Sequence, residues 1–207
     1  MAVDVFIDEL QRFADEAFHA ELVASRVEYF SVLGKVNDDD EFFEAHLERF
    51  LDWFLFERKL EATEYSPLEH FIEVRGADLP PERLAVYEGL LKNVHSLFQI
   101  KKTVKNGLYL RDLLTKAKYF VESDVPAAFT KGDLFEARLL PIEDEWHFSK
   151  GYIFHPPSTI KAILKRVKKI DVADMDACRA FIRELAIRRL RSDRYKHVDA
   201  IQFYEFD

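Results

Sequence analysis

The spacing of hydrophobic positions predicts helices in the first part of the chain. Over residues 3–33, apolar side chains such as Phe6, Leu10 and Phe13 recur at steps of three and four residues, with acidic residues between them. This spacing is typical of an amphipathic helix. A second helix is expected over about 39–58, where the apolar residues cover more than one face, so this helix should be deeply buried.

Two shorter helices are indicated by the residues at which they would start. Ser66 supplies a capping hydroxyl, Pro67 suits the first helical position, and Glu69 places a carboxylate in the first turn. A proline pair followed by an acid at 80–82 gives a similar start to a helix that runs to about residue 92. The first part of the chain is therefore expected to be helical throughout.

From about residue 95 the hydrophobic period changes to two, which is typical of strands. Asn106 and Gly107 between two such runs predict a tight hairpin, because both turn positions need positive φ. Pro141 is expected to end the fourth strand. Short strands at this spacing indicate a small antiparallel five-stranded barrel or a strongly bent sheet. The expected strands cover about 98–104, 108–110, 118–123, 134–140 and 146–154.

The end of the chain returns to helical spacing. A short helix is expected from Ser158 to about Val167, and a longer one opens at Asp171 or Asp174 and runs through Leu190. We predict an α+β fold in which these C-terminal helices pack back on one or both of the earlier regions, and the alternative is two independent domains. The three regions are helical 1–93, a small β-domain 94–157, and a basic helical segment 158–207.

Composition places the chain among globular proteins. It has 207 residues, 48% of them hydrophobic, and its 19 Phe, 8 Tyr and 2 Trp exclude the aromatic-poor composition of disordered chains. Cys178 is the single cysteine, so a reducing compartment and a buried thiol are expected. No apolar run is long enough for a membrane span, and the acidic start is unlike a signal peptide. We therefore expect a cytoplasmic protein of bacterial type with no membrane partner.

The net charge of −8 is unevenly distributed. Residues 161–196 hold 12 Lys and Arg against 5 Asp and Glu, a net of +7, so the remainder sums to −15. This segment is a candidate site for nucleic acid, for an acidic partner, or for the acidic surface of the protein itself. Three tyrosines expected to be exposed on the β-domain, Tyr109, Tyr119 and Tyr152, favour nucleic acid, because bases stack on aromatic rings. The basic candidates are Lys161, Lys165, Arg166, Lys168, Lys169, Arg188, Arg191 and Arg194.

Motifs of the common enzyme classes are absent from the sequence. The six glycines are too scattered for a phosphate-binding loop, and neither the Gly-x-Ser-x-Gly elbow nor a zinc-protease pair of histidines occurs. No metal and no cofactor are predicted. A ligand site in the β-domain could comprise Asp112, Asp133, Arg138 and Trp146. Roles in turns are the favoured interpretation of the two aspartates, and an ion pair with a carboxylate inside the β-domain is the favoured interpretation of Arg138.

A succession of short motifs runs through the middle of the chain. In order they comprise Trp53 to Glu57, then Pro67, Leu68 and Phe71, then Gly107, Leu108 and Leu110 to Leu113, then Gly132 to Leu134, Ala137 to Leu139 and Pro141. Over about residues 50–155 this order resembles a group of uncharacterised bacterial proteins, some of which carry a C-terminal SEC-C zinc motif. The single cysteine excludes that zinc motif here. The resemblance implies a shared scaffold of helices and strands and assigns no catalytic residue.

Three functions from different classes are compatible with these patterns. The first is a non-enzymatic protein-interaction or regulatory module, which the dense aromatic residues and the missing catalytic motifs favour. The alternative is nucleic-acid binding through 161–196, and the third is an enzyme that uses the carboxylate and arginine site of the β-domain. A protein partner or self-association is expected, because an apolar helix over 42–56 must be covered by the β-domain or by another subunit.

Overall fold

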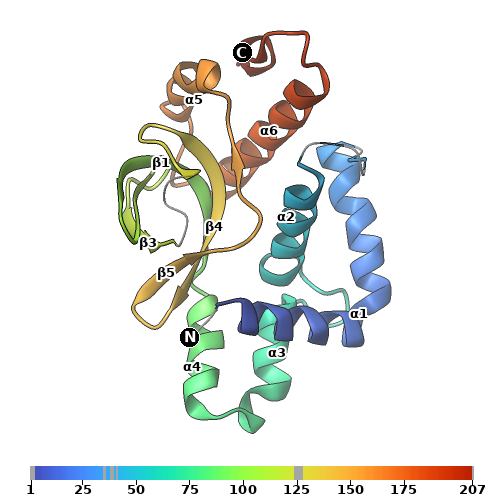
Figure 1. Ribbon diagram of the computed structural model, residues 1–207. Coiled ribbons are helices and arrows are strands. Elements are labelled where there is room, and N and C mark those ends of the chain that lie inside the picture. The colour runs from blue at the N-terminus through green and yellow to red at the C-terminus, as the bar shows by residue number, and fades with distance from the viewer. Residues whose placement is uncertain (1–2, 35, 38–39, 41, 124–127, 207) are drawn as a thin grey trace.

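The computed structural model describes the whole chain except residues 1–2, 35, 38–39, 41, 124–127 and 207. Its architecture is α+β: the N-terminal helices lie to one side of and below a small β-barrel, and the last helices cover another part of it (Figure 1). This arrangement confirms the fold class predicted from the sequence. Within the described residues, no helix is long and apolar enough to cross a membrane.

The N-terminal part consists of α1 (Val3–Leu33), α2 (Phe43–Phe56), α3 (Pro67–Arg75) and α4 (Pro81–Leu90). The helix α1 bends at Phe18, whose φ of −135° and ψ of 29° are not helical, so its two halves run in different directions (Figure 1). Side chains of both halves pack on α2 and α3 in one hydrophobic cluster. The helix α2 begins at Phe43, a few residues later than its apolar pattern indicates.

The start of α3 confirms the prediction made from its first residues. The Ser66 hydroxyl accepts a hydrogen bond from the Glu69 backbone N–H at 3.3 Å, and the Glu69 carboxylate accepts one from the Ser66 N–H at 2.6 Å. Pro67 occupies the first helical position. Two backbone donors that the helix itself leaves unpaired are thus satisfied reciprocally.

The β-domain is a five-stranded mixed barrel. Its strands follow the order β1-β2-β3-β5-β4, and β4 also pairs with β1, which closes the sheet on itself. The pairs are antiparallel except that β3 and β5 run parallel at Val121 and Trp146. The strands are β1 (Val94–Val104), β2 (Gly107–Asp112), β3 (Lys118–Glu122), β4 (Leu134–Ile142) and β5 (Glu145–Phe148), and a short β6 (Ile153–Phe154) extends the sheet beside β4.

The structure corrects several predictions about these strands. The barrel is mixed rather than antiparallel throughout, because β3 and β5 run parallel. Neither Asn106 nor Gly107 has the positive φ expected of the hairpin turn, because the turn lies at residues 105–106 and Gly107 already belongs to β2. Pro141 does not end β4 but pairs with Trp146. It lies beyond Leu139, the last β4 residue that pairs with β1, so β4 has a neighbour on one side only at this point and tolerates the missing N–H. The single strand expected over 146–154 is broken into β5 and β6, and the chain between them brings Gly151 against the backbone of α2.

The C-terminal part packs back onto the barrel. It contains α5 (Ile160–Val167), α6 (Met175–Arg194) and a short 3-10 helix (Ala200–Tyr204). Side chains of α5 and α6 share a hydrophobic cluster with Leu97 of β1 and Leu134 of β4. Cys178 lies in this cluster and is buried, as its sequence context predicted. The barrel is therefore held between two sets of helices.

Candidate functional site

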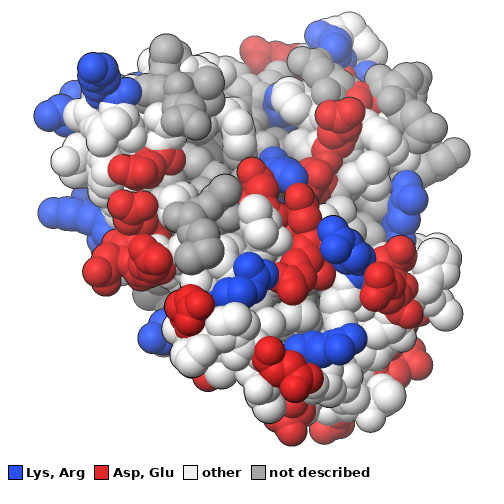
Figure 2. Space-filling view, turned by 60° about the horizontal axis from the view of Figure 1, so that its bottom comes forward, with Lys and Arg blue, Asp and Glu red and all other residues white. Residues whose placement is uncertain are grey.

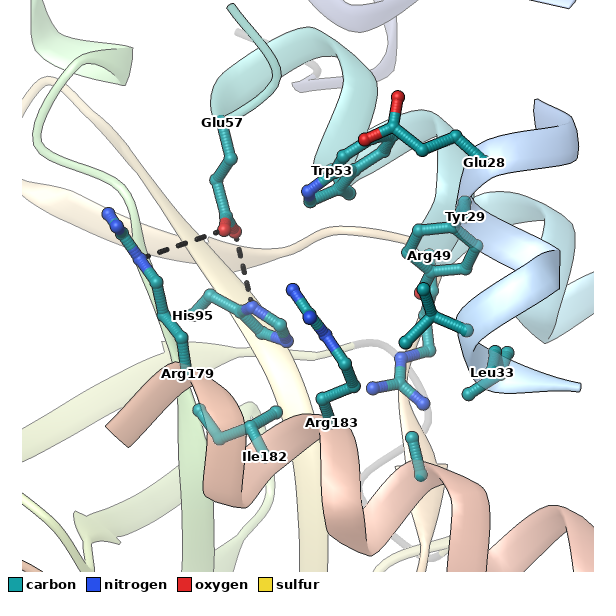
Figure 3. A pocket seen from close by; sticks show the side chains of 12 residues that line it. Glu28, Tyr29, Leu33, Arg49, Trp53, Glu57, His95, Arg179, Ile182 and Arg183 are labelled. Atoms are coloured by element: carbon teal, nitrogen blue, oxygen red, sulfur yellow. Dashed lines mark ion pairs between the residues drawn. The ribbon is translucent and has the colours of Figure 1, made fainter. Parts of the chain in front are cut away.

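A cavity at the junction of α1, α2, β1 and α6 is the candidate site (Figure 3). Its volume is about 110 Å³, several times the roughly 10–15 Å³ that one water molecule needs. It therefore has room for a small ion or for one end of a larger ligand. Most of its polar lining carries charge or can acquire it, from Glu28, Arg49, Glu57, His95, Arg179 and Arg183.

Arg49 of α2 lines this cavity with a side chain that is only 4% exposed. Its Nη2 donates a hydrogen bond to Glu136 on β4, whereas no described residue accepts from its Nε or Nη1. Burial is the largest influence on Arg49 and opposes its charge, but the charges of Glu136 and other nearby acidic groups, together with the hydrogen bond to Glu136, raise the pKa of Arg49. The guanidinium is thus charged and incompletely satisfied, a state that a bound anion or ordered water relieves.

Arg49 is held in place by a series of buried polar groups on the barrel side of the cavity. Glu136 is fully buried, and His155 Nε2 lies 3.1 Å from its Oε1. The other ring nitrogen of His155 is 2.9 Å from the hydroxyl of Tyr204. Burial alone would raise the pKa of Glu136, but Arg49 and His155 hold it below its usual value. Glu136 therefore stays ionised and positions Arg49 while leaving two of its nitrogens unused.

Glu57, the residue directly after α2, lines another part of the cavity and is surrounded by basic groups. It accepts a hydrogen bond from Arg138 of β4, lies 3.3 Å from His95 Nδ1 and lies 3.9 Å from Arg179 Nε. Burial alone would raise the pKa of Glu57, but the hydrogen bond with His95 and the charge of Arg138 hold it well below its usual range. This carboxylate is therefore ionised and already shared among basic groups.

The cavity has a surplus of positive charge. Glu28 pairs with Arg58 at 3.0 Å, and Glu57 is engaged as described, so both carboxylates of the lining have cationic partners. Arg183 extends from α6 into the cavity, and no described carboxylate forms an ion pair with it (Figure 3). Arg49 and Arg183 thus offer guanidinium donors that an anion can accept from, in the forked geometry that matches carboxylate and phosphate.

Two aromatic side chains form an apolar wall of the same cavity. The Tyr29 ring of α1 and the Trp53 ring of α2 have centroids 5.3 Å apart and are tilted by 41° (Figure 3). Burial raises the pKa of the Tyr29 hydroxyl, so Tyr29 is neutral and acts as a flat apolar surface. The arrangement therefore combines charged donors with aromatic surface, which suits an anionic group attached to a planar apolar body.

The basic residues predicted from the sequence fall into two groups. Lys161, Lys165, Lys168 and Lys169 are exposed on or just after α5, where Arg166 is half-buried. By contrast, two arginines of α6 are engaged internally. Arg188 pairs with Glu184 at 2.6 Å and donates to two backbone carbonyls of the C-terminal segment, and Arg194 pairs with Asp40 at 2.9 Å. Arg191, on the same helix, is exposed.

The structure does not bring the four residues of the predicted β-domain ligand site together. Each contacts other residues, and no hydrogen bond, ion pair or ring contact among the described residues joins two of the four, which are Asp112, Asp133, Arg138 and Trp146. Asp112 accepts from the Leu114 N–H at 2.8 Å and Asp133 from the Thr130 N–H at 3.0 Å, which confirms their turn roles. Trp146 stacks edge-on against Tyr119.

Arg138 forms no ion pair with a carboxylate of the described part of the β-domain, so the prediction of such a pair was wrong. Its partners, Glu57 and Asp52, belong to the α2 region, because the Arg138 side chain projects from β4 toward the helices. Arg138 also lies 5.1 Å from the ring of Phe56. It joins the barrel to the helical part and borders the cavity through Glu57.

The prediction of three exposed tyrosines holds for one of them. Tyr109 is 47% exposed on β2. Tyr119 and Tyr152 are instead packed against the barrel core, because their rings contact Phe98 and Phe129 respectively. Among the described residues, no group of three or more His, Cys, Asp or Glu side chains is arranged to hold a metal ion.

The fold and the cavity define an α+β protein whose helices and mixed barrel meet at a cationic pocket. The chain belongs to DUF7986, a family of unknown function, whose family model matches residues 12–179. This match agrees with the sequence resemblance in that it places the chain in a family of unknown function. A search of curated proteins gave no match, and a search of solved structures gave none.

Sequence reasoning missed the cavity residues. One signal was available: Arg49 and Asp52 interrupt the most apolar helical stretch, and a buried charged residue in such a stretch indicates a partner from another element. The partner itself could not be read from the sequence, because Glu136 lies 87 positions away.

Proposed function

We propose that the protein is a non-enzymatic regulatory module that binds a small anionic ligand in the cavity between α1, α2, β1 and α6. The ligand class is a carboxylate or phosphate carried on a planar apolar group. The observation that carries this proposal is Arg49, a buried guanidinium that lines the cavity with two nitrogens lacking acceptors. Arg183 supplies a second cation, and Trp53 with Tyr29 supplies the apolar surface.

A regulatory role is supported by where the cavity lies. Its walls come from the N-terminal helices, from the first barrel strand and from α6, three parts of the chain that are far apart in sequence. A ligand bound there contacts all of them at once, so its binding free energy adds to the stability of their arrangement. Such coupling lets a small molecule change how the helices sit on the barrel.

Tryptophan fluorescence tests the proposal directly. The chain has two tryptophans, so Trp146→Phe leaves Trp53, which lines the cavity, as the single reporter. We expect sodium benzoate to change its emission saturably, inorganic phosphate to do so more weakly, and the uncharged analogue benzamide to have no effect. Arg183→Gln should weaken benzoate binding by about tenfold or more, because charge-assisted hydrogen bonds contribute about 1.5–3 kcal/mol.

Arg191→Gln is the matched control, because Arg191 is an exposed arginine of the same helix that does not line the cavity. It should leave benzoate affinity unchanged. Equal responses to benzoate and benzamide, or no saturable response to either anion, would contradict the proposal.

The exposed lysines of α5 support a second candidate function, binding of a polyanion by the basic segment 161–196. Lys161 and Lys165 on α5 and Lys168 and Lys169 just after it are exposed, and no described carboxylate forms an ion pair with them. Lysines in such a setting bind phosphate groups with an affinity that falls as salt rises. Replacing the four lysines together by Gln tests this candidate, and a loss of oligonucleotide binding in that variant would support it.

A further inference from the structure

The outer face of β1, β2 and β3 carries a row of aromatic and basic side chains. Tyr109 on β2 lies opposite Phe120 on β3 on one side and opposite Lys102 on β1 on the other. The centroids of the two rings are 5.0 Å apart, and Lys102 Nζ lies 6.0 Å from the Tyr109 centroid. Because Tyr109 is 47% exposed, the rings form an accessible platform bordered by a cation.

A second row beside the first adds positive charge. Arg111 on β2 lies opposite Lys118 on β3, and both side chains are exposed. The residues between the two rows, Leu110 and Tyr119, point into the barrel. The alternation of strand side chains therefore places aromatic and basic groups on one continuous outer surface.

The charge of this face is opposite to that of most of the protein. Six cations occur between residues 101 and 118, namely Lys101, Lys102, Lys105, Arg111, Lys116 and Lys118. The carboxylate in that stretch, Asp112, is fully buried and accepts hydrogen bonds from Ser96 and Thr115, and Glu122 at the end of β3 is the one exposed carboxylate on these three strands. No described carboxylate forms an ion pair with any of the six cations.

The N-terminal helical part, by contrast, has an excess of negative charge. The first 93 residues hold 22 Asp and Glu against 9 Lys and Arg. Figure 2, in which the lower end of Figure 1 faces forward, shows acidic side chains interspersed with basic ones over that end. Arginines there pair with neighbouring carboxylates, as Arg83 does with Glu9. The cations of the β1–β2–β3 face have no such partners and keep their charge available for an external anion.

We propose that the β1–β2–β3 face binds single-stranded nucleic acid. Unpaired bases stack on exposed aromatic rings, and phosphates pair with lysine and arginine, so one strand needs both kinds of group close together. Tyr109 and Phe120 supply the rings, and Lys102, Arg111 and Lys118 surround them on three adjacent strands. No described helix covers this side of the barrel (Figure 1).

A single strand fits this face better than a duplex or an acidic peptide. In a duplex the base faces are stacked on one another, so the ring platform would have no partner. An acidic peptide would use the cations but leave the two rings without a matched surface. Small five-stranded barrels commonly bind oligonucleotides over their strand faces, which agrees with the argument from these residues at the level of fold.

This surface is separate from the cavity described above. The cavity lies between the barrel and the helices α1, α2 and α6, whereas the β1–β2–β3 face is on the uncovered side of the barrel (Figure 1). The inference thus goes beyond the proposed regulatory ligand, and either one can fail without the other.

The test is fluorescence anisotropy with the full-length protein and labelled twelve-nucleotide probes, dT12 and rU12, in 50 mM NaCl. We expect saturable binding of both strands and at least tenfold weaker binding of a twelve-base-pair duplex. Tyr109→Ala should weaken binding at least fivefold, since stacking contributes about 1–3 kcal/mol per base. Replacing both Lys102 and Lys118 by Gln should reduce the slope of log affinity against log salt by about 1.4, because each phosphate contact contributes about 0.7 on single strands.

The matched comparison is a variant with Lys161, Lys165, Lys168 and Lys169 of the α5 region all replaced by Gln. Its affinity should stay within twofold of the wild type if the strands form the site. All variants alter exposed side chains, and circular dichroism confirms their fold before binding is measured.

Four results would overturn the proposal. They are no binding of either single strand at 50 mM NaCl, an unchanged affinity of Tyr109→Ala, loss of binding in the α5 variant alone, and displacement of the oligonucleotides by poly-glutamate at equal charge concentration. The third result would assign nucleic-acid binding to α5, and the fourth would assign the face to an acidic peptide.

Discussion

His46 should make the stability of the protein depend on pH, because it is buried as a neutral imidazole. It lies on α2, is 1% exposed, and has no hydrogen-bond partner for either ring nitrogen among the described residues. Burial and the nearby charge of Arg49 lower the pKa of His46 from 6.5 to about 4. The unfolded chain therefore takes up this proton at a higher pH than the folded chain does. The stability linked to His46 is complete above pH 6.5 and is lost as the pH falls toward 4.

The size of this effect follows from the two pKa values. At pH 4.5 the unfolded imidazole is almost fully protonated and the folded one is mostly neutral. The difference amounts to about 2.5 kcal/mol, since each pKa unit corresponds to about 1.4 kcal/mol. His46→Met removes the titrating group, keeps a good helix former of similar size, and breaks no hydrogen bond.

Urea unfolding of the wild type and of His46→Met at pH 7.5 and 4.5 measures the effect. We expect the free energy of unfolding of the variant, relative to the wild type, to rise by about 2–3 kcal/mol between pH 7.5 and pH 4.5. Other titrating groups cancel in this comparison. Leu47→Met, which introduces methionine at the neighbouring position of α2 and changes no titrating group, serves as the control and should show no such rise. Parallel pH dependences of His46→Met and the wild type would refute the reasoning that the fold excludes a charged His46.

Three further substitutions test the packing around the site and the fold. Glu136→Gln leaves Arg49 buried without its counter-charge, so the free energy of unfolding should fall by about 3–5 kcal/mol in urea titrations, and a loss below 1 kcal/mol would mean that the pair is not formed. Ser66→Ala removes the cap of α3 and should cost about 1 kcal/mol by the same measurement, whereas an unchanged stability would contradict the capping geometry. Gly151→Ala would place a Cβ 2.7 Å from the Arg49 backbone nitrogen, so the melting temperature should drop by several degrees, and an unchanged one would show that this close approach does not exist.

Local signals in the sequence predicted the elements that depend on neighbouring residues. The start of α3 is set by Ser66, Pro67 and Glu69, which act within one turn of helix. The β1–β2 hairpin lies where Asn106 and Gly107 indicated it, but the reason given for it was wrong. The turn is formed by Lys105 and Asn106, Gly107 already pairs with Val104, and neither Asn106 nor Gly107 has positive φ. Features that depend on distant parts of the chain escaped prediction. The break between β5 and β6 occurs where Gly151 meets α2, about 100 positions earlier in the sequence, and no period in the sequence encodes that contact.

The candidate site escaped prediction for the same reason. Its side chains come from four elements, from Glu28 on α1 to Arg183 on α6, and apart from Arg49 its charged residues resemble ordinary surface charges in their own segments. Only the folded arrangement shows that two nitrogens of Arg49 lack acceptors and that Arg183 points into the same cavity. The aromatic and basic pattern on the barrel was closer to prediction, because Tyr109 was correctly expected to be exposed. Its cations were overlooked beside the more obvious basic run that begins at Lys161.

The most direct test of the central claim, that the cavity binds an anion, is NMR of the arginine side chains. In a ¹⁵N-labelled sample the Nε–H resonances of Arg49 and Arg183 report on acceptors at those groups, and Arg191 is the internal reference because it does not line the cavity. Titration with sodium benzoate should shift the Arg49 and Arg183 resonances saturably, with one common dissociation constant, and leave Arg191 in place. Uniform small shifts of all three, or none at all, would contradict the account.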